Sequence, residues 1–281
     1  HTFYILSLDS FVTDFFKKNK FQNVNVINLN ELENYYVELK VAKKNRDLIE
    51  YYFTLSPFLP RFIYERRGIK QITYLDSDFY FFKSPKKLIY RNYESSVVLI
   101  KQNVKEKYGL YNVGWIYFNF KFEETFKITK KWGSQCIDLC QDLPSKNSYA
   151  DQKYLDTWVK ELNYAKVLHP EYTCLSPWDS NLSLEENSEN MIAFHFHALE
   201  VSSNEFSTGF NKYNKKISNE LIEKIYKPYI KNLLSLEKKY NISSASIRNK
   251  RKKFFSKILI KLRTIKSYVK KIYYEDKFYL W

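Results

Sequence analysis

Two aspartates stand at the end of an apolar stretch in ITYLDSDFYFF, residues 72–82. Charged side chains are seldom buried unless they are paired or bound to a cation. Two carboxylates at positions i and i+2 also repel each other at close range unless a cation lies between them. Asp76 and Asp78 are therefore candidate ligands of Mg²⁺ or Mn²⁺, hard ions that take carboxylate oxygens and often share their shell with a substrate's phosphates. The alternative is a solvent-exposed pair that caps a turn.

Two of the four histidines alternate in AFHFHALE, residues 193–200. If this segment is a strand, His195 and His197 lie on one face of it. Neutral imidazole is a common ligand of borderline metals, and two oxygens with one nitrogen suit Mn²⁺ better than Ca²⁺. The alternative is a pair of hydrogen-bonded strand histidines, so the metal hypothesis depends on the other motifs.

Two further motifs place polar residues at the start of expected elements. In SYADQKYLDTW, residues 148–158, Asp151 and Gln152 open an expected helix, where an aspartate also serves as an N-terminal cap. In YGLYNVGWIYFN, residues 108–119, Asn112 and Gly114 interrupt an aromatic run just before an expected strand. Glycine at this point would let the backbone approach a ligand, or would simply make the turn.

These motifs fall on a pattern of alternating strands and helices. We expect strands over 2–8, 23–29, 71–78, 95–100, 114–120, 166–169 and 191–197, and helices over 10–20, 31–66 (broken near 56–60), 122–141, 151–160 and 217–240. The alternation predicts an α/β fold with a mainly parallel central sheet flanked by helices. In such sheets ligands bind beyond the carboxyl ends of the strands, which is where Asp76 and Asp78 fall.

The composition is that of a globular protein with a large core, since the 281 residues are 44% hydrophobic and 27% charged. We find no signal peptide and no run of about 18 apolar residues, and we expect no membrane span. The cysteines Cys136, Cys140 and Cys174 form no Cys-x-x-Cys pair, and no histidine lies within four residues of any of them. A disulfide framework and a zinc site are therefore both unexpected, which suits a reducing compartment.

The formal net charge of +15 is concentrated at the carboxyl end. From Arg248 to Trp281 there are twelve lysines and arginines against two acids. Apolar residues recur there at helical spacing, which predicts an amphipathic helix on an anionic membrane surface. Nucleic-acid binding and a solvated helix are the alternatives. The sequence thus divides into an α/β domain over 1–240 and a basic helical extension over 241–281.

The motifs YLDSD, YNVGWIYFN, ADQKYLDTW and HFHA, in this order and spacing, resemble those of a known enzyme family. They are similar to bacterial nucleotide-diphospho-sugar glycosyltransferases of GT-A fold, related to glycosyltransferase family 8 (the glycogenin and lipopolysaccharide galactosyltransferase group). The resemblance covers roughly residues 2–235. It implies that Asp76, Asp78 and His195 hold Mn²⁺ (or Mg²⁺) on the donor diphosphate, with His197 as a rival ligand.

The same resemblance implies roles around the donor sugar. Asn112 and Gly114 would line the sugar site. Asp151 and Gln152 would be the catalytic pair that touches the sugar, with the amide near its anomeric carbon. NRDLIEYYFTLSPFL, LSPWDSN and IYKPYI resemble further family segments, and Trp178 within them is a candidate for substrate binding. Asp78 and His197 are further candidates for contact with the donor.

Three family features lack a direct counterpart. The Lys-Pro-Trp that follows the metal histidine is missing, because HFHA continues as LEVSSNEF. The arginine that precedes the Asp-x-Asp strand is also unmatched, so Arg46 or Arg61 would have to substitute for it. Finally, TFYILSLD resembles the family's second strand rather than its first.

The resemblance implies a transferase that retains anomeric configuration and prefers a UDP-sugar. A basic helix on an anionic membrane would suit a glycan or lipid-linked glycan acceptor at the inner face of the cytoplasmic membrane. Two other interpretations compete with it. One is a phosphotransferase of the haloacid-dehalogenase type, although its Asp-x-Asp usually lies in the first strand. The other is a non-catalytic α/β scaffold whose basic tail binds nucleic acid or membrane.

Overall fold

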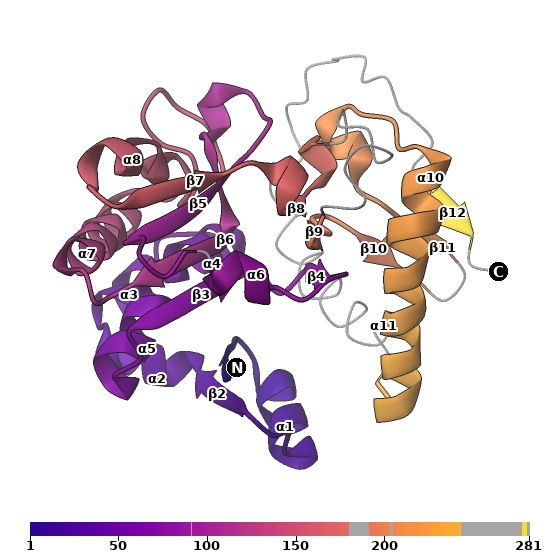
Figure 1. Ribbon diagram of the computed structural model, residues 1–281. Coiled ribbons are helices and arrows are strands. Elements are labelled where there is room, and N and C mark those ends of the chain that lie inside the picture. Colours follow the sequence, from indigo (N-terminus) through magenta and orange to yellow (C-terminus); the bar gives the residue numbers. More distant parts are fainter. Residues whose placement is uncertain (91, 180–190, 203–204, 243–276, 280–281) are drawn as a thin grey trace. The chain divides into compact units, whose positions relative to one another are not determined.

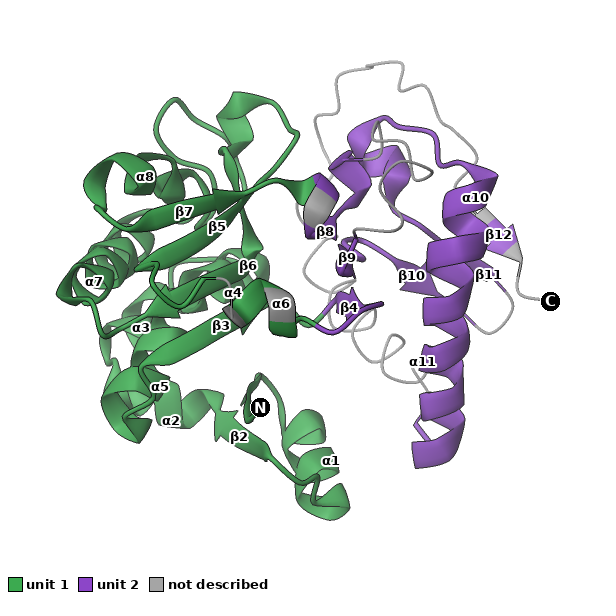
Figure 2. Ribbon diagram, in the orientation of Figure 1, with its two compact units in different colours: residues 1–77, 85–170 green, residues 78–84, 171–281 purple. Residues whose placement is uncertain are grey.

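The computed structural model describes residues 1–90, 92–179, 191–202, 205–242 and 277–279. The chain has the predicted α/β architecture (Figure 1). It divides into two compact units (Figure 2): unit 1 holds residues 1–77 and 85–170, and unit 2 holds residues 78–84 and 171–281. The first crossing from one unit to the other therefore falls between Ser77 and Asp78, inside the Asp-x-Asp motif.

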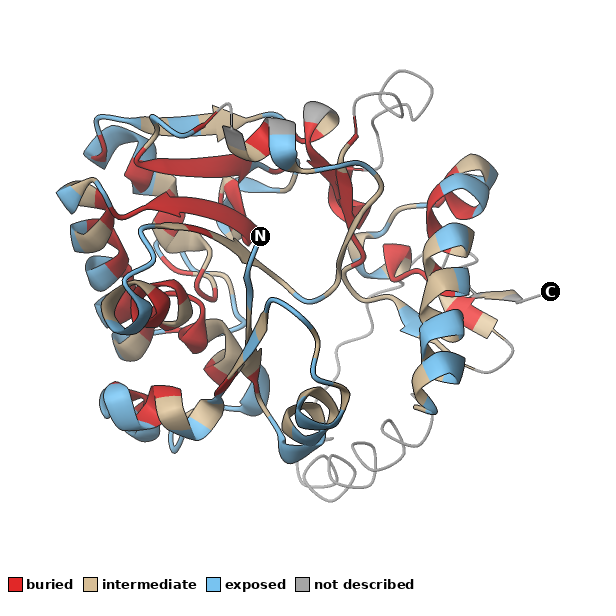
Figure 3. Cartoon of the chain, turned by 60° about the horizontal axis from the view of Figure 1, so that its bottom comes forward, coloured by how far each residue is buried: buried red, intermediate tan, exposed pale blue. Residues whose placement is uncertain are grey.

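Unit 1 is built on a four-stranded sheet in the order β3-β6-β5-β7. The strands are β3 (Gln71–Leu75), β5 (Val97–Lys101), β6 (Tyr111–Asn119) and β7 (Ala165–Leu168). β6 pairs antiparallel with both β3 and β5, whereas β5 and β7 are parallel. Every residue of β6 is buried, and Figure 3 shows such buried strands in red. A strand buried on both faces needs a continuous apolar run, which the aromatic-rich motif supplies.

A second, two-stranded element lies at the start of unit 1. β1 (Phe3–Ser7) and β2 (Val24–Asn28) pair in parallel, and helix α1 (Ser10–Asn19) connects them. The Asp9 side chain caps this helix by accepting a hydrogen bond from the Val12 N–H at 2.9 Å. Parallel strands require such a crossover connection, so the predicted succession of strand, helix and strand is present here.

The helices of unit 1 bury an aromatic core with the sheet. They are α2 (Leu29–Tyr35), α3 (Glu38–Ala42), α4 (Leu48–Leu55), α5 (Phe58–Arg67), α6 (Lys86–Tyr90), α7 (Glu123–Asp138) and α8 (Trp158–Glu161). α7 buries one face at helical spacing, and Trp132 on that face packs edge-on against Trp158 with ring centroids 5.3 Å apart. Large rings in specific contact contribute both apolar burial and a preferred geometry.

Unit 2 contains two small sheets and a long helix. β4 (Phe79–Phe81), β9 (Ala193–His195) and β8 (Cys174–Leu175) form one sheet, and β10 (Glu200–Val201), β11 (Glu205–Ser207) and β12 (Lys277–Tyr279) form the other. α10 (Asn219–Leu221) continues through a π-helical turn (Ile222–Tyr226) into α11 (Lys227–Tyr240). The core is again aromatic, and Phe196 stacks on Tyr229 with centroids 4.0 Å apart.

The structure differs from the predicted elements in three places. The four-stranded sheet is mixed rather than mainly parallel, because β6 runs antiparallel to both of its neighbours. The expected helix 151–160 is a 3₁₀ turn (Lys153–Thr157) that runs into α8. β9 ends at His195, so His197 lies beyond the strand.

Two further expectations concern the carboxyl end. The predicted boundary at residue 240 and the basic extension fall largely on residues 243–276, outside the described residues, so both stay predictions. Among the helices that the structure describes, none is both long enough and apolar enough to span a membrane.

Two glycines with positive φ allow a matched test of packing in unit 2. Gly209 has φ +80°, and a Cβ there would lie 2.7 Å from the Ala198 Cβ, whereas Gly68 has φ +68° and open space. Gly68→Ala should cost only the left-handed backbone strain, about 1–2 kcal/mol. Gly209→Ala should cost about 1–3 kcal/mol more because of overpacking. Urea unfolding of both variants measures the difference, and equal costs would contradict the close approach to Ala198.

Candidate functional site

In unit 1, the first carboxylate of the motif is tied to β6. Asp76 follows the last residue of β3, and its backbone N–H donates to the Gly114 carbonyl at 2.9 Å. The Gly114 N–H in turn donates to Oδ1 of the buried Asn112 at 2.8 Å. The β5–β6 register shifts at this point, where Leu99 faces Ile116 and Ile100 faces Asn112. The pairing of β3 with β6 brings these two predicted motifs together, and the irregularity lies beside them, as such irregularities often do next to functional sites.

A third motif joins this group through two hydroxyls. The Tyr74 Oη donates to Asp76 Oδ1 at 3.0 Å and lies 3.3 Å from the Ser56 Oγ. Ser56 also hydrogen-bonds the side chain of Asp151, a residue that is only 4% exposed. Trp132 Nε1 fixes the backbone of the same residue by donating to the Asp151 carbonyl at 2.7 Å. The chain Asp76–Tyr74–Ser56–Asp151 thus links two predicted site carboxylates within unit 1.

The Asp151 carboxyl is electrostatically unusual. Burial raises its pKa, the Ser56 hydrogen bond partly offsets this, and the charge of Asp76 raises it again, to about 7. Capping does not explain this residue, because the 3₁₀ turn after it has no side-chain cap bond. A buried carboxyl with a perturbed pKa is a candidate functional group for a stated physical reason.

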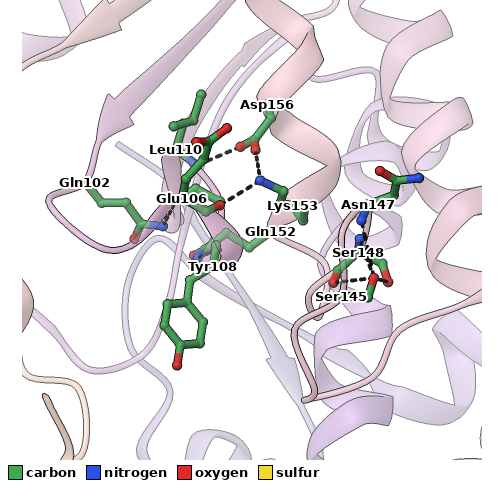
Figure 4. Close-up of polar contacts among 11 residues, drawn as sticks. Gln102, Glu106, Tyr108, Leu110, Ser145, Asn147, Ser148, Gln152, Lys153 and Asp156 are labelled. Carbon is green, nitrogen blue, oxygen red and sulfur yellow. Dashed lines mark hydrogen bonds and ion pairs between the residues drawn. The ribbon is translucent and has the colours of Figure 1, made fainter.

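Gln152 points toward a neighbouring loop. Its side-chain amide donates to the Tyr108 carbonyl at 2.6 Å (Figure 4). Next to it, the Lys153 Nζ donates to the Glu106 carbonyl at 2.6 Å and pairs with Asp156 at 2.7 Å. Asp156 also accepts from the Leu110 N–H at 2.6 Å. These contacts fasten the loop before β6, and the predicted role of Gln152 at the sugar stays a prediction.

Both candidate arginines have contacts inside unit 1. The Arg46 guanidinium donates to the carbonyls of Cys136 and Ile137, at the end of α7, and to the Thr54 Oγ1 at 2.5 Å. These are contacts of a helix C-terminal cap. The guanidinium of Arg61 lies 4.9 Å from the centroid of the Tyr36 ring. A substrate role for either arginine remains a prediction.

In unit 2, the second carboxylate meets the first histidine of HFH. Phe79 pairs with His195 across β4 and β9, and the Phe196 N–H donates to the Asp78 carbonyl at 2.8 Å. This register places His195 Nε2 at 3.0 Å from Asp78 Oδ1. Burial raises the pKa of the Asp78 carboxyl, but the hydrogen bond from His195 and the nearby histidine charges outweigh it and hold the pKa below its usual value.

His197 and Trp178 belong to the same cluster. The Trp178 ring centroid lies 5.4 Å from that of His195 and 5.6 Å from that of His197. The His197 Nδ1 is hydrogen-bonded to the Tyr213 hydroxyl. Burial, followed by the charge of His195, lowers the pKa of His197 to about 4, so its imidazole is neutral at pH 7. The indole N–H of Trp178 is buried and has no hydrogen-bond partner among the described residues.

Two lysines outside the sequence motifs reach this cluster. The Lys215 Nζ donates to the Trp178 carbonyl at 2.5 Å, and the charge of Lys212 contributes to the low pKa of His197. Both follow the turn at Gly209, after β10 and β11 have paired as antiparallel strands. That pairing returns the chain to the histidines. The lysine of the family's Lys-Pro-Trp, which is missing directly after HFHA, therefore has two candidate counterparts, Lys212 and Lys215. The sequence feature that could have indicated them is Gly-Phe-Asn-Lys at 209–212.

The two carboxylates of the motif are held together by the chain itself. Asp76 is near the end of a segment of unit 1 and Asp78 begins unit 2, with the exposed Ser77 between them. Their Cα atoms can be at most about 7 Å apart, because only two peptide units separate them.

Unit 2 also has a cleft of about 300 Å³ beside Asp78, lined mainly by apolar residues such as Phe196, Leu199 and Leu233.

Comparisons with known proteins give distant relatives. No protein-family model matches the chain. Two proteins of Bacillus subtilis (strain 168) are similar in sequence: "Uncharacterized protein YfnD" is 24% identical over 251 residues, covering 82% of this chain and 78% of that protein. "Uncharacterized protein YfnF" is 26% identical over 226 residues, covering 71% and 73%.

Three solved structures are similar to this one. Mouse xyloside xylosyltransferase 1 has a TM-score of 0.46 and 14% identity over 69% of this chain and 83% of that chain. A glycosyltransferase involved in glycosylation of the major capsid of PBCV-1 has 0.41 and 11% over 70% and 95%. The galactosyltransferase LgtC, in complex with donor and acceptor sugar analogs, has 0.40 and 15% over 70% and 76%. The names of all three describe glycosyltransferases.

The raised pKa of Asp151 predicts a pH-dependent effect of its replacement. The folded state keeps the proton to about pH 7, whereas an unfolded carboxyl loses it near 3.8, so stability falls as the pH rises between these values. Asp151→Asn removes this loss. Its gain in unfolding free energy should be about 2–3 kcal/mol larger at pH 8 than at pH 5.

Urea unfolding at both pH values in EDTA measures this gain. Asp138→Asn, which removes an exposed carboxylate from the same unit, serves as the control. A gain for Asp151→Asn that is the same at both pH values would contradict the raised pKa.

Proposed function

We propose that this chain is a metal-dependent glycosyltransferase that moves a sugar from a nucleotide-diphosphate sugar to a glycan or glycolipid acceptor. The observation that carries the proposal is the contact of Asp78 Oδ1 with His195 Nε2 at 3.0 Å, with Asp76 two residues away in the chain. The ordered sequence motifs support the same conclusion, because each of them supplies residues to one of the two clusters described above.

The donor atoms suit a divalent cation. Asp76 and Asp78 offer carboxylate oxygens and His195 an imidazole nitrogen. Two cis ligands of an octahedral ion, each about 2.1 Å from the metal, lie about 3 Å apart, which matches the distance between Asp78 and His195. The oxygen and nitrogen set favours Mn²⁺, or Mg²⁺. A bound cation would stabilise the negative charge that develops on the leaving diphosphate.

Other residues of unit 2 would contact the same anion. Lys212 and Lys215 supply positive charge beside the histidines, and the Trp178 indole offers a buried N–H donor. Burial lowers the pKa of Lys215, so an arriving diphosphate would strengthen its charged form. Because His197 is neutral at pH 7, it adds no repulsion to a nearby cation.

The residues of unit 1 would recognise the sugar. Asn112 carries an amide beside Gly114 and Asp151 carries a carboxyl near Ser56, and such groups hydrogen-bond to sugar hydroxyls. Gln152 would have to release the Tyr108 carbonyl to approach the anomeric carbon. Retention of configuration and a UDP-sugar donor follow from the family resemblance and belong to this proposal.

We extend the proposal to the place of action. A glycan or lipid-linked glycan acceptor fits an enzyme at the cytoplasmic face of an anionic membrane. The basic segment 241–281 would make that contact, since each lysine or arginine near such a surface contributes about 1 kcal/mol.

A thermal-shift panel tests the donor and the metal together. UDP, GDP, CMP and ADP are each added with Mn²⁺ or with EDTA to the unmodified chain, to Asp78→Asn and to Glu223→Gln. The last variant makes the same change at an exposed acid on the helical part of unit 2.

One diphosphate at 100 times its Kd should add about 2.7 kcal/mol, only with Mn²⁺ and only when Asp78 is intact. Glu223→Gln should respond like the unmodified chain. A shift that survives EDTA and Asp78→Asn, or no shift with any nucleotide, would contradict the proposal.

A further inference from the structure

The two carboxylates of unit 1 are joined by the side chains of Tyr74 and Ser56, to which the sequence motifs assign no role. We infer that Tyr74 and Ser56 are positioning residues that hold Asp76 and Asp151 in fixed orientations. The metal ligand Asp76 and the sugar-contacting Asp151 then belong to one hydrogen-bond network. This inference rests on the proposed function, in which Asp76 is a metal ligand and Asp151 contacts the donor sugar.

Tyr74 orients Asp76 because of strand geometry. Residues i and i+2 of a strand project on the same face, so a tyrosine in β3 and the aspartate just after it lie side by side. The Tyr74 Oη donates to Asp76 Oδ1 at 3.0 Å. The backbone of Asp76 is held separately by the Gly114 carbonyl. With backbone and one carboxylate oxygen both fixed, Asp76 Oδ2 is left with a defined direction.

Ser56 connects this pair to the second carboxylate. It follows α4 (Leu48–Leu55), is 4% exposed, and its Oγ lies 3.3 Å from the Tyr74 Oη. The same hydroxyl hydrogen-bonds the Asp151 side chain. Residues from α4, β3 and the loop before the 3₁₀ turn therefore meet at one serine, although they are far apart in sequence.

The number of donors matches the number of carboxylates. Tyr74 and Ser56 each carry one hydroxyl proton, and an ionised carboxylate only accepts. The Tyr74 hydroxyl donates its hydrogen bond to Asp76, so the Ser56 hydroxyl can donate to Asp151 or to the Tyr74 oxygen. Loss of either hydroxyl would remove one hydrogen-bond donor from this chain and so loosen the orientation of a carboxylate. Residues that orient metal ligands in this way typically change metal affinity 10–100-fold when they are replaced.

Mn²⁺ affinity of the full chain tests the role of Tyr74, with the EPR signal of free Mn²⁺ as the readout and no nucleotide or acceptor present. Tyr74→Phe should raise the Kd at least about tenfold. Tyr117→Phe is the matched control, because it removes a hydroxyl from a buried tyrosine of the same sheet, where it accepts from Gln71 Nε2 at 2.9 Å. This control should bind Mn²⁺ like the unmodified chain.

A double-mutant cycle tests whether Ser56 acts through Tyr74. Ser56→Ala alone should weaken Mn²⁺ binding about threefold, the effect of one neutral hydrogen bond, and should have no further effect in the Tyr74→Phe background. Equal losses in Tyr74→Phe and Tyr117→Phe would indicate general destabilisation and overturn the inference. Additive losses would overturn the coupling through Ser56.

Asp76→Asn separates this inference from the proposed function. If Asp76→Asn leaves Mn²⁺ binding unchanged, the proposed metal site is wrong. If Asp76→Asn weakens binding and Tyr74→Phe does not, the metal site stands and the positioning role of Tyr74 is refuted. Circular dichroism of each variant shows whether it is folded before its affinity is compared.

Discussion

The backbone hydrogen bond from Asp76 to Gly114 is the constraint on which the arrangement in unit 1 depends. This bond extends the pairing of β3 with β6 by one residue, from Leu75 to Asp76, the first carboxylate of the motif. Because β6 is buried along its whole length, the position of Asp76 is fixed by the core rather than by a mobile loop. The register shift opposite Asn112 then supplies an irregular point at which a buried strand can present polar groups.

This arrangement has an energetic cost that the surrounding structure offsets. A carboxyl as buried as Asp151 is unfavourable when it is ionised, and a buried polar network is stable only if its members are paired. The hydroxyl of Ser56 and the indole of Trp132 supply such pairing in unit 1. In unit 2 the rings of Phe79 and Trp178 enclose His195, whose side chain is only 4% exposed. Natural proteins accept such local penalties mainly where a site requires them.

The sequence was informative wherever the signal is local. The alternation of apolar runs located most strands and helices, and Asp76 lies at the carboxyl end of a strand as expected, although β3 ends at Leu75 rather than at residue 78. The family resemblance implied that Asp78 and His195 lie together, and their contact in the structure needs the pairing of β4 with β9. Local patterns do not show which segments of the chain lie next to each other in the fold. Ser56 and Lys215 reach their clusters only through tertiary packing and through the pairing of β10 with β11.

The mixed sheet has the same explanation. Apolar periodicity identifies a buried strand but not its direction, so the antiparallel course of β6 was invisible in the sequence. Gln152 is another example, because the carbonyl that it binds belongs to a loop whose closure depends on Lys153 and Asp156. Motif residues were therefore easier to identify than the direction in which each side chain points.

The three cysteines have a consequence for how the protein can be studied. All are free and buried, Cys136 and Cys140 in unit 1 and Cys174 in unit 2. Burial raises the thiol pKa of Cys136 and Cys174, so neither reacts readily while its surroundings stay closed. Alkylation by a thiol reagent therefore requires local opening. Each unit thus carries a native reporter of its own opening rate, which mass spectrometry can read separately without introducing any label.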